Sequence, residues 1–300
     1  MIQKITKKYH WIAAGLTFAI LWASASTATK IGLNAAQPLS IAIVRFGVAA
    51  LIMLAYSHLI RGNRLPEGKE WKQIAIYGLL NISIYLGCYV IAMQKVTAGI
   101  GALAVATNPV FISFISVFFL NKKLTLNVII ALCICSAGVV CAAWPWFNNT
   151  TVTTEGLMIL LFSMLSYSLA AIYFSSSNWN NLDLFTINGW QTLIGGILLL
   201  PVACFYYNGS NNHFNLTFWG AVLWLAIPVS IFAVQLWLWL LKTNTIKAGM
   251  WLFLCPIFGF SIAALIMKDT ISTYTIVGVL LVMIGLVLSQ KTQKDHLESK

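Results

Sequence analysis

The chain has 300 residues, of which 60% are hydrophobic and only 8% are charged, and its formal net charge is +11. This composition excludes an ordinary soluble domain and predicts an all-α integral membrane protein with several transmembrane helices. The apolar runs are continuous rather than alternating, which argues against a transmembrane β-barrel. The positive charge is therefore interpreted as a determinant of topology, and no nucleic acid is expected as a partner.

Ten apolar runs follow one another, and a helix of about 20 apolar residues can cross the bilayer. The first five helices are predicted at residues 11–31, 38–59, 71–94, 98–120 and 124–144. The other five are predicted at residues 155–174, 184–206, 218–241, 247–267 and 272–289. The charge-free connector 146–154 separates a first five-helix repeat, 1–148, from a second, 149–300. Ala23-Ser24-Ala25 resembles the cleavage site of a secretory signal, but the apolar run continues past it, which favours a retained first helix.

The distribution of basic residues predicts the orientation of these helices. With a cytoplasmic N-terminus, 14 of the 18 lysines and arginines fall on the cytoplasmic side, and only Lys30, Lys95 and Lys268 fall outside. This positive-inside pattern places both termini in the cytoplasm, and the expected location is the inner membrane of a bacterium. Because each half holds an odd number of helices, the second half is expected to cross the membrane in the opposite sense.

The second half also repeats the pattern of the first, at an offset of 147 residues. Residues 89–140 correspond to residues 236–287, and both stretches contain an apolar run, a lysine break, a proline within a second apolar run, and a final glycine. The matched positions include Lys95 with Lys242, Pro109 with Pro256 and Gly138 with Gly285. An inverted repeat of this kind predicts a site between the two halves that opens alternately to either side.

The first half contains Trp22 in the first helix, Pro38 before a second helix that contains Arg45-Phe46, and the segment from Lys95 to Pro109. Together with the two five-helix halves, these features resemble the EamA-type carriers of the drug/metabolite transporter superfamily. The resemblance covers about residues 8–290. It implies a ten-helix inverted-repeat carrier of small metabolites, often amino acids or related organic solutes, and frequently an exporter. The second half departs from the first, since Tyr167 stands in place of Trp22, and Trp190-Gln191 in place of Arg45-Phe46.

The candidate substrate-binding residues are aromatic or amide side chains predicted near the middle of the membrane. They are Trp22, Tyr85, Tyr89, Asn108, Tyr167, Gln235, Trp239 and Trp251. Tyr85 and Tyr89 are four residues apart and share one helical face, and Gln235 and Trp239 repeat that spacing. Such groups bind organic solutes through ring contacts and a few hydrogen bonds, although simple packing in the helix bundle is the alternative for each of them.

Two prolines and one arginine lie within predicted helices. Pro109 and Pro256 each remove a helical hydrogen bond, and they are interpreted either as kinks that open a binding site or as packing kinks. Arg45 is expected to face protein or water because an arginine at the bilayer centre costs about 2.5–3.5 kcal/mol. It either attracts a carboxylate or ties helix ends together, and the second reading is slightly preferred.

The sequence contains no sign of catalysis, cofactor binding or a metal site. The seven acidic residues fall in predicted loops, tails or helix ends, and the six cysteines form no CxxC pair. An absent membrane carboxylate favours a facilitator over a proton antiporter. The first hypothesis is therefore a transporter whose partners are the lipid bilayer and a small organic solute. The alternative is a membrane receptor or assembly component that moves no solute, and the choice between monomer and homodimer stays open.

Overall fold

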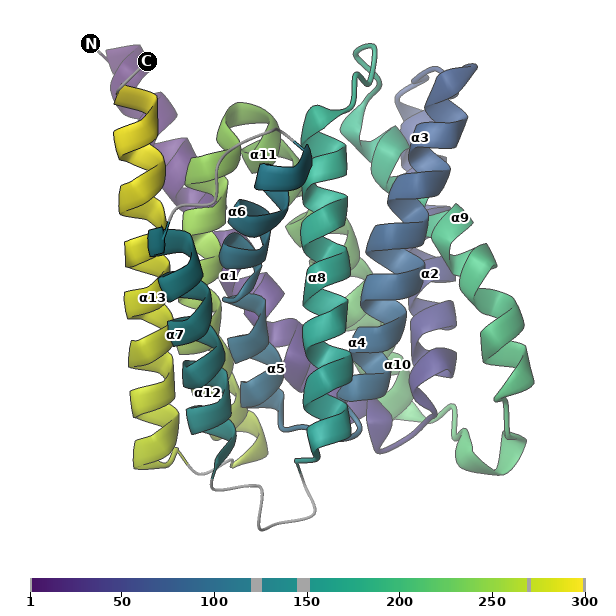
Figure 1. Ribbon diagram of the computed structural model, residues 1–300. Coiled ribbons are helices and arrows are strands. Elements are labelled where there is room, and N and C mark those ends of the chain that lie inside the picture. The colour runs from purple at the N-terminus through teal and green to yellow at the C-terminus, as the bar shows by residue number, and fades with distance from the viewer. Residues whose placement is uncertain (1, 120–125, 145–151, 269–270, 299–300) are drawn as a thin grey trace.

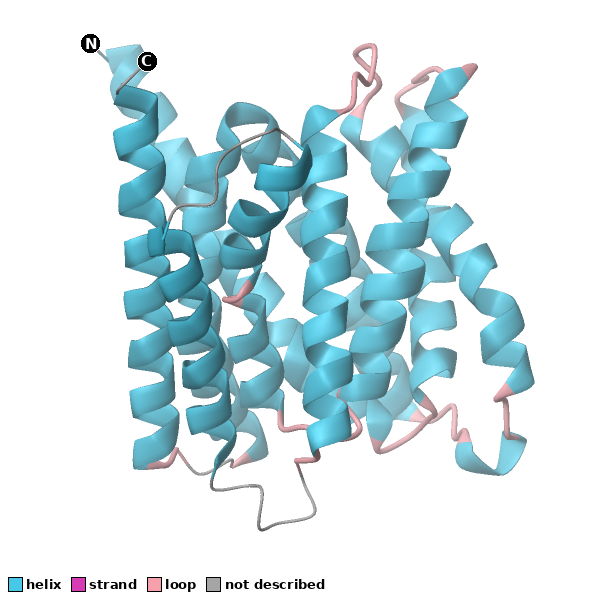
Figure 2. Cartoon of the chain, in the orientation of Figure 1, coloured by secondary structure: helices cyan, strands magenta, loops and turns pink. Residues whose placement is uncertain are grey.

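The computed structural model of the protein describes residues 2–119, 126–144, 152–268 and 271–298. Within these ranges the regular structure is helical and contains no strand (Figure 2), so the predicted all-helical class is confirmed. Six helices have the length and composition to cross a membrane: His10–Leu33, Pro38–Ile60, Lys69–Ala92, Thr154–Ser176, Leu184–Phe205 and Leu216–Thr243. Four apolar helices are shorter: Ala98–Ile112, Ile129–Ala142, Leu254–Met267 and Thr273–Gly285.

The helices of the first half lie close to their predicted positions. They are α1 (Ile2–Leu33), α2 (Pro38–Leu54) with the π-helix η1 (Ala55–Ile60), α3 (Lys69–Gly78), the π-helix η2 (Leu79–Leu86), α4 (Gly87–Ala92), α5 (Ala98–Val105), α6 (Asn108–Phe119) and α7 (Leu126–Ala143). The predicted connector between the halves lies largely at residues 145–151, outside the described residues.

The second half follows with a similar order of elements. They are α8 (Thr154–Ser176), α9 (Leu184–Phe205), the 3₁₀ turn η4 (Gly209–Asn211), α10 (Leu216–Trp224), the π-helix η5 (Leu225–Ala233), α11 (Val234–Gly249), the 3₁₀ turn η6 (Met250–Phe253), α12 (Leu254–Met267) and α13 (Thr273–Glu298). Some boundaries differ from the prediction: residues 242–246, predicted as a connector, continue helix α11, and the first and last helices extend to Ile2 and Glu298.

Both halves contain a π-helix at the same place. The π-helix η2 begins at Leu79, and η5 covers the positions found by adding 147 to its residue numbers. A π-helix closes i→i+5 hydrogen bonds, so its turns hold more residues than α-helical turns, and such segments are frequent at functional sites. Pro228 lies inside η5, whereas η2 contains no proline.

Both predicted prolines lie at a break between two helical segments. The chain leaves helix α5 at Val105, and Pro109 is the second residue of α6. In the other half η6 ends at Phe253, and Pro256 is the third residue of α12. Proline fits the first turn of a helix because the amide hydrogens there have no partner within the helix. The prolines therefore begin new helices rather than kinking continuous ones.

Helices from the two halves pack against each other across the bundle (Figure 1). Helix α7 lies beside α13, and α2 lies beside α9. Helix α1 packs against α12 and η5, while α8 packs against α6 and η2. Both chain termini lie at the same end of the bundle (Figure 1).

Glycines allow α7 and α13 to approach closely. A Cβ atom added to Gly138 would lie 2.8 Å from the carbonyl oxygen of Gly278 and from Val282. A Cβ atom added to Gly285 would lie 2.9 Å from the carbonyl oxygen of Ala131 and 2.7 Å from Cys135. Small residues permit such backbone contacts between membrane helices, which are then stabilised by close van der Waals packing.

Polar contacts join α2 to α9 at both ends. At one end, the Gln37 side chain donates to the Tyr206 carbonyl at 3.0 Å and accepts from Asn212 at 2.8 Å. At the other end, the hydroxyls of Ser57 and Thr186 lie 2.7 Å apart, and both are buried. Side-chain hydrogen bonds between membrane helices contribute about 0.6 kcal/mol each on average. These contacts join Gln37 and η1, which flank α2, to α9 and the turn that follows it.

Candidate functional site

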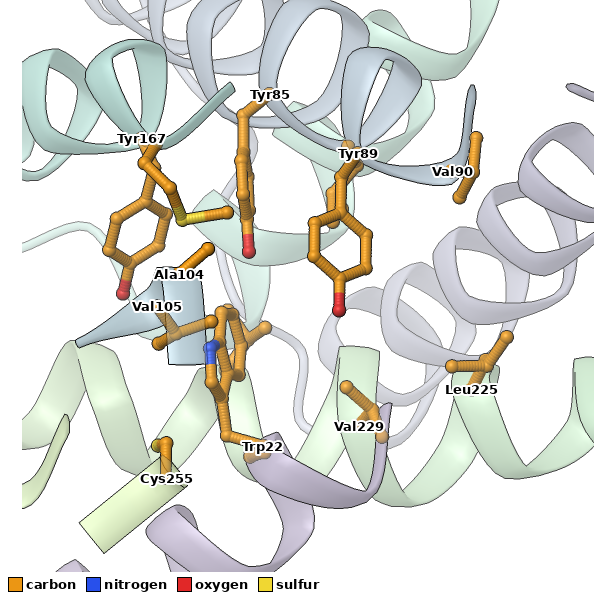
Figure 3. Close-up of a cluster of buried hydrophobic side chains, with 14 of the residues drawn as sticks. Trp22, Tyr85, Tyr89, Val90, Ala104, Val105, Tyr167, Leu225, Val229 and Cys255 are labelled. Atoms are coloured by element: carbon orange, nitrogen blue, oxygen red, sulfur yellow. The ribbon is translucent and has the colours of Figure 1, made fainter. Parts of the chain in front are cut away.

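An aromatic cluster lies where helices of the two halves meet (Figure 3). It consists of Phe18 and Trp22 on α1, Tyr85 on η2, Tyr89 on α4, Tyr167 on α8 and Trp237 on α11. All six side chains are buried. Four of the predicted substrate-binding residues, Trp22, Tyr85, Tyr89 and Tyr167, are therefore brought together.

The rings of this cluster contact one another in a chain that crosses between the halves. The ring centroids of Trp22 and Tyr167 lie 5.9 Å apart, and those of Tyr85 and Tyr167 lie 4.8 Å apart. The centroids of Tyr85 and Tyr89 are 6.1 Å apart, as their spacing on one helical face predicts. The hydroxyl groups of the three tyrosines point toward the same region as the Trp22 ring (Figure 3). The cluster thus combines apolar ring faces with convergent polar atoms.

Two polar atoms in and beside the cluster are buried without a hydrogen-bond partner among the described residues. They are the hydroxyl of Tyr167 and the side-chain Nδ2 of Asn108. Asn108 begins α6 and is reached from α8 by Ser168, whose hydroxyl donates to the Asn108 carbonyl at 3.3 Å. A buried polar group left unpaired costs about 1–3 kcal/mol. Such groups are therefore candidate contacts for the polar atoms of a bound solute.

The other three predicted substrate-binding residues have different surroundings. Gln235 and Trp251 are half-buried, and the Gln235 Oε1 and Trp251 Nε1 atoms have no hydrogen-bond partner in the described part of the chain. The ring of Trp251 covers Gly15, where an added Cβ would lie 1.9 Å from it. Trp239 is 40% exposed, and its ring contacts Trp11 with a centroid distance of 5.8 Å. Trp239 therefore lies outside the aromatic cluster.

Arg45 is buried within α2 and contacts the second half. Its Nε donates to the hydroxyl of Ser230 on η5 at 2.8 Å, and its guanidinium carbon lies 5.7 Å from the centre of the Phe46 ring. Tyr85 and Tyr89 also interact with Arg45 electrostatically. Arg45 therefore borders the aromatic cluster.

A chain of buried amide side chains continues from Ser230 across three helices. The Asn188 side chain on α9 donates to the Ser230 carbonyl at 3.0 Å, and Gln191 donates to Asn188 at 3.0 Å. Asn81 on η2 then donates to Gln191 at 3.1 Å. These bonds connect the π-helices η2 and η5 through α9.

Sequence reasoning missed two members of the cluster and the amide chain. Phe18 lies one helical turn before Trp22 and shares its face, so the i, i+4 spacing contained that signal. Trp237 was missed because the sequence analysis chose the helix face that carries Gln235 and Trp239 as the substrate-binding face. Among the described residues no group of three histidine, cysteine, aspartate or glutamate side chains forms a metal site.

Comparison with known proteins agrees with this arrangement. The EamA-like transporter family matches the chain twice, over residues 10–144 and 154–290. An uncharacterized transporter of Archaeoglobus fulgidus is 25% identical over 301 residues, covering 97% of this chain and 100% of that protein. The uncharacterized inner membrane transporter YedA of Escherichia coli is 28% identical over 232 residues, covering 76% of this chain and 74% of its own length.

A solved crystal structure has the same fold with a TM-score of 0.68. It is 16% identical in sequence, and the match covers 93% of this chain and 96% of that one. The two family matches together span far more than half of the chain. The protein is therefore a multi-pass membrane protein that belongs to the EamA-like transporter family.

Proposed function

We propose that the protein carries small organic metabolites, amino acids or related solutes, out of the cell by alternating access. The six candidate membrane spans and the four shorter apolar helices then form ten crossings. An even number of crossings agrees with termini at one end of the bundle (Figure 1). The positive-inside pattern favours the cytoplasm for that end, in a bacterial inner membrane.

Equivalent contacts in the two halves support an inverted repeat. Gly138 and Gly285 are related by the 147-residue offset, and so are their respective partners Val282 and Cys135. The π-helices η2 and η5 and the proline breaks follow the same offset. In the proposed repeat, α1 corresponds to α8, and α6 corresponds to α12. The packing of α1 against α12 therefore has its equivalent in the packing of α8 against α6. Two copies with opposite orientation can rock against each other around a fixed site.

The observation that carries the proposal is the aromatic cluster with its unpartnered polar atoms. Both halves contribute rings to it, so a relative movement of the halves changes which side reaches it. A solute that slots between the rings would bury apolar surface against Trp22 and Tyr85. The unpartnered hydroxyl of Tyr167 and amide of Asn108 would then bond to the solute's polar groups.

We propose that the protein is a facilitator, in which transport is not coupled to a proton gradient. The ion pairs among the described residues join Arg64 to Glu70 and Lys95 to Glu155, and all four residues lie in connectors or near helix ends. Neither of these carboxylates lies at the cluster, where a proton-coupled carrier would need a titratable group. The solute's own gradient and charge would then drive its movement, with about 2.3 kcal/mol per unit charge per 100 mV.

The test is transport by the purified protein in proteoliposomes loaded with a mixture of amino acids and other small organic solutes. Mass spectrometry of the external medium would identify solutes that leave faster than from protein-free vesicles. We expect at least one such solute, and we expect Trp22→Leu to reduce its efflux at least tenfold, or about 1.4 kcal/mol in barrier height.

The matched control is Trp239→Leu, which removes an indole outside the cluster and should leave efflux within about twofold. A solute that binds the purified protein and never crosses the membrane would contradict transport. Equal losses in both variants would contradict the location of the site.

A further inference from the structure

We propose that Arg45 binds a carboxylate of the transported solute, so that the substrates of this carrier are organic monoanions or carboxylate-bearing amino acids. This inference rests on the transport function proposed above and adds the chemical class of the substrate. It starts from a charge that the structure leaves without an opposite charge.

Arg45 is only 2% exposed, and a charged group at such a site is stable only when it is paired and hydrogen-bonded. Its contacts with the described residues are neutral: the Ser230 hydroxyl on Nε and the Phe46 ring. The carboxylates of Glu70 and Glu155 pair with other cations. Among the described side chains, then, Arg45 has no carboxylate partner.

The guanidinium group has five N–H donors, and the bond to Ser230 uses one of them. The remaining fork matches the two oxygens of a carboxylate, which accepts two parallel N–H bonds. One guanidinium balances one negative charge, whereas a dianionic phosphate would call for a second cation. This charge balance favours a carboxylate over a phosphate.

Arg45 is also placed to orient the rest of the solute. Helix α2, which carries Arg45, packs against α4, which carries Tyr89 of the aromatic cluster. A carboxylate on Arg45 would therefore leave the solute's apolar body against Trp22 and Tyr167. The amide chain from Ser230 through Asn188 holds the helices around Arg45 in place.

The experiment uses matched pairs of aromatic acids and their neutral amides: phenylacetate with phenylacetamide, and indole-3-acetate with indole-3-acetamide. Binding to the purified protein is measured by isothermal titration calorimetry. At least one acid should bind about thirtyfold more tightly than its amide, which is the effect of one buried charge pair. Arg45→Gln should abolish that preference while binding of the amide persists, and Arg45→Lys should retain part of it.

The control variant is Lys95→Gln, which removes a cation paired with Glu155 and should leave the acid-to-amide ratio unchanged. Equal affinity for acid and amide, no acid binding, or equal weakening of both by Arg45→Gln would overturn the assignment. A preference for a phosphate ester would overturn it as well. If efflux in proteoliposomes yields a solute without a carboxylate, the inference fails while the transport function stands. If efflux yields no solute, the transport function itself fails.

Discussion

The interface between α7 and α13 and the aromatic cluster are built in opposite ways. At the α7–α13 interface, Gly138 and Gly285 make equivalent contacts that follow the 147-residue offset. At the cluster, the offset relates the backbone but not the side chains: η2 and η5 match in position, yet the equivalent of buried Tyr85 is the exposed Phe232, and the equivalent of Tyr89 is Leu236 on α11. The α7–α13 pair therefore acts as a symmetric frame, and the side chains at the centre differ between the halves.

Under the inverted repeat proposed above, this difference separates positions used for packing from positions used for binding. Packing of backbone on backbone accepts only glycine or alanine, so both copies retain small residues there. A binding site must fit an asymmetric solute, so equivalent positions can carry different groups. Trp22 and Tyr167 illustrate this, because the resemblance pairs them and their rings meet at 5.9 Å.

The largest expected effect is on the symmetric frame. Gly278→Leu would place a side chain where even a Cβ atom lies 2.5 Å from the Gly138 carbonyl oxygen. Because a backbone atom cannot move aside cheaply, we expect a loss of about 3 kcal/mol in the free energy of unfolding. Thermal unfolding in detergent measures this loss. Gly47→Leu is the control, since no atom lies within 4 Å of an added Cβ there, and an equal loss would remove the argument from packing.

A smaller effect tests whether the frame is symmetric. Gly138→Ala and Gly285→Ala each add one methyl group against a backbone carbonyl, at 2.8 Å and 2.9 Å respectively. We expect each substitution to cost about 1–2 kcal/mol of stability, with the two losses agreeing within about 0.5 kcal/mol. The same unfolding measurement decides the matter. A large loss in one variant and none in the other would show that the two halves carry the frame unequally.

The smallest effect on stability is expected at the centre. Tyr167→Phe removes a hydroxyl that has no partner among the described residues. The unfolding free energy should therefore stay constant or rise by up to about 1 kcal/mol, while efflux of the transported solute falls about tenfold. Tyr77→Phe is the control, because Tyr77 is buried against Phe174 outside the cluster and its loss should not alter efflux. Unchanged efflux in Tyr167→Phe would remove this hydroxyl from the site.

Periodicity and composition predicted much of this arrangement. The apolar runs predicted the positions of the helices, and the 147-residue offset predicted the equivalent prolines. The four-residue spacing of Tyr85 and Tyr89 predicted their shared face. Trp237 could not be predicted in this way, because the i, i+4 spacing of Gln235 and Trp239 marks another face of α11, and the spacing alone does not show which face packs against α1. An α-helical reading therefore selected Trp239, which is exposed, over Trp237, which is buried.

The amide chain shows a second limit of the sequence. Asn81, Gln191 and Ser230 lie far apart along the chain, and each alone is an ordinary polar residue in an apolar run. Their hydrogen bonds depend on how three helices pack. The surroundings of Arg45 could not be predicted for the same reason. Its neutral contacts with Ser230 and Phe46 depend on the folded structure, so the sequence could give only a slight preference for a structural role.

The most direct test of the central claim is the reactivity of Cys255, which is buried beside the aromatic cluster (Figure 3). The experiment uses a variant in which alanine replaces the other five cysteines. A membrane-impermeant maleimide is applied to one side of oriented membranes and then, in a separate sample, to the other. Alternating access predicts that Cys255 is labelled from both sides and protected by the transported solute. Labelling from one side only, or from neither side during transport, would contradict a central site that opens alternately.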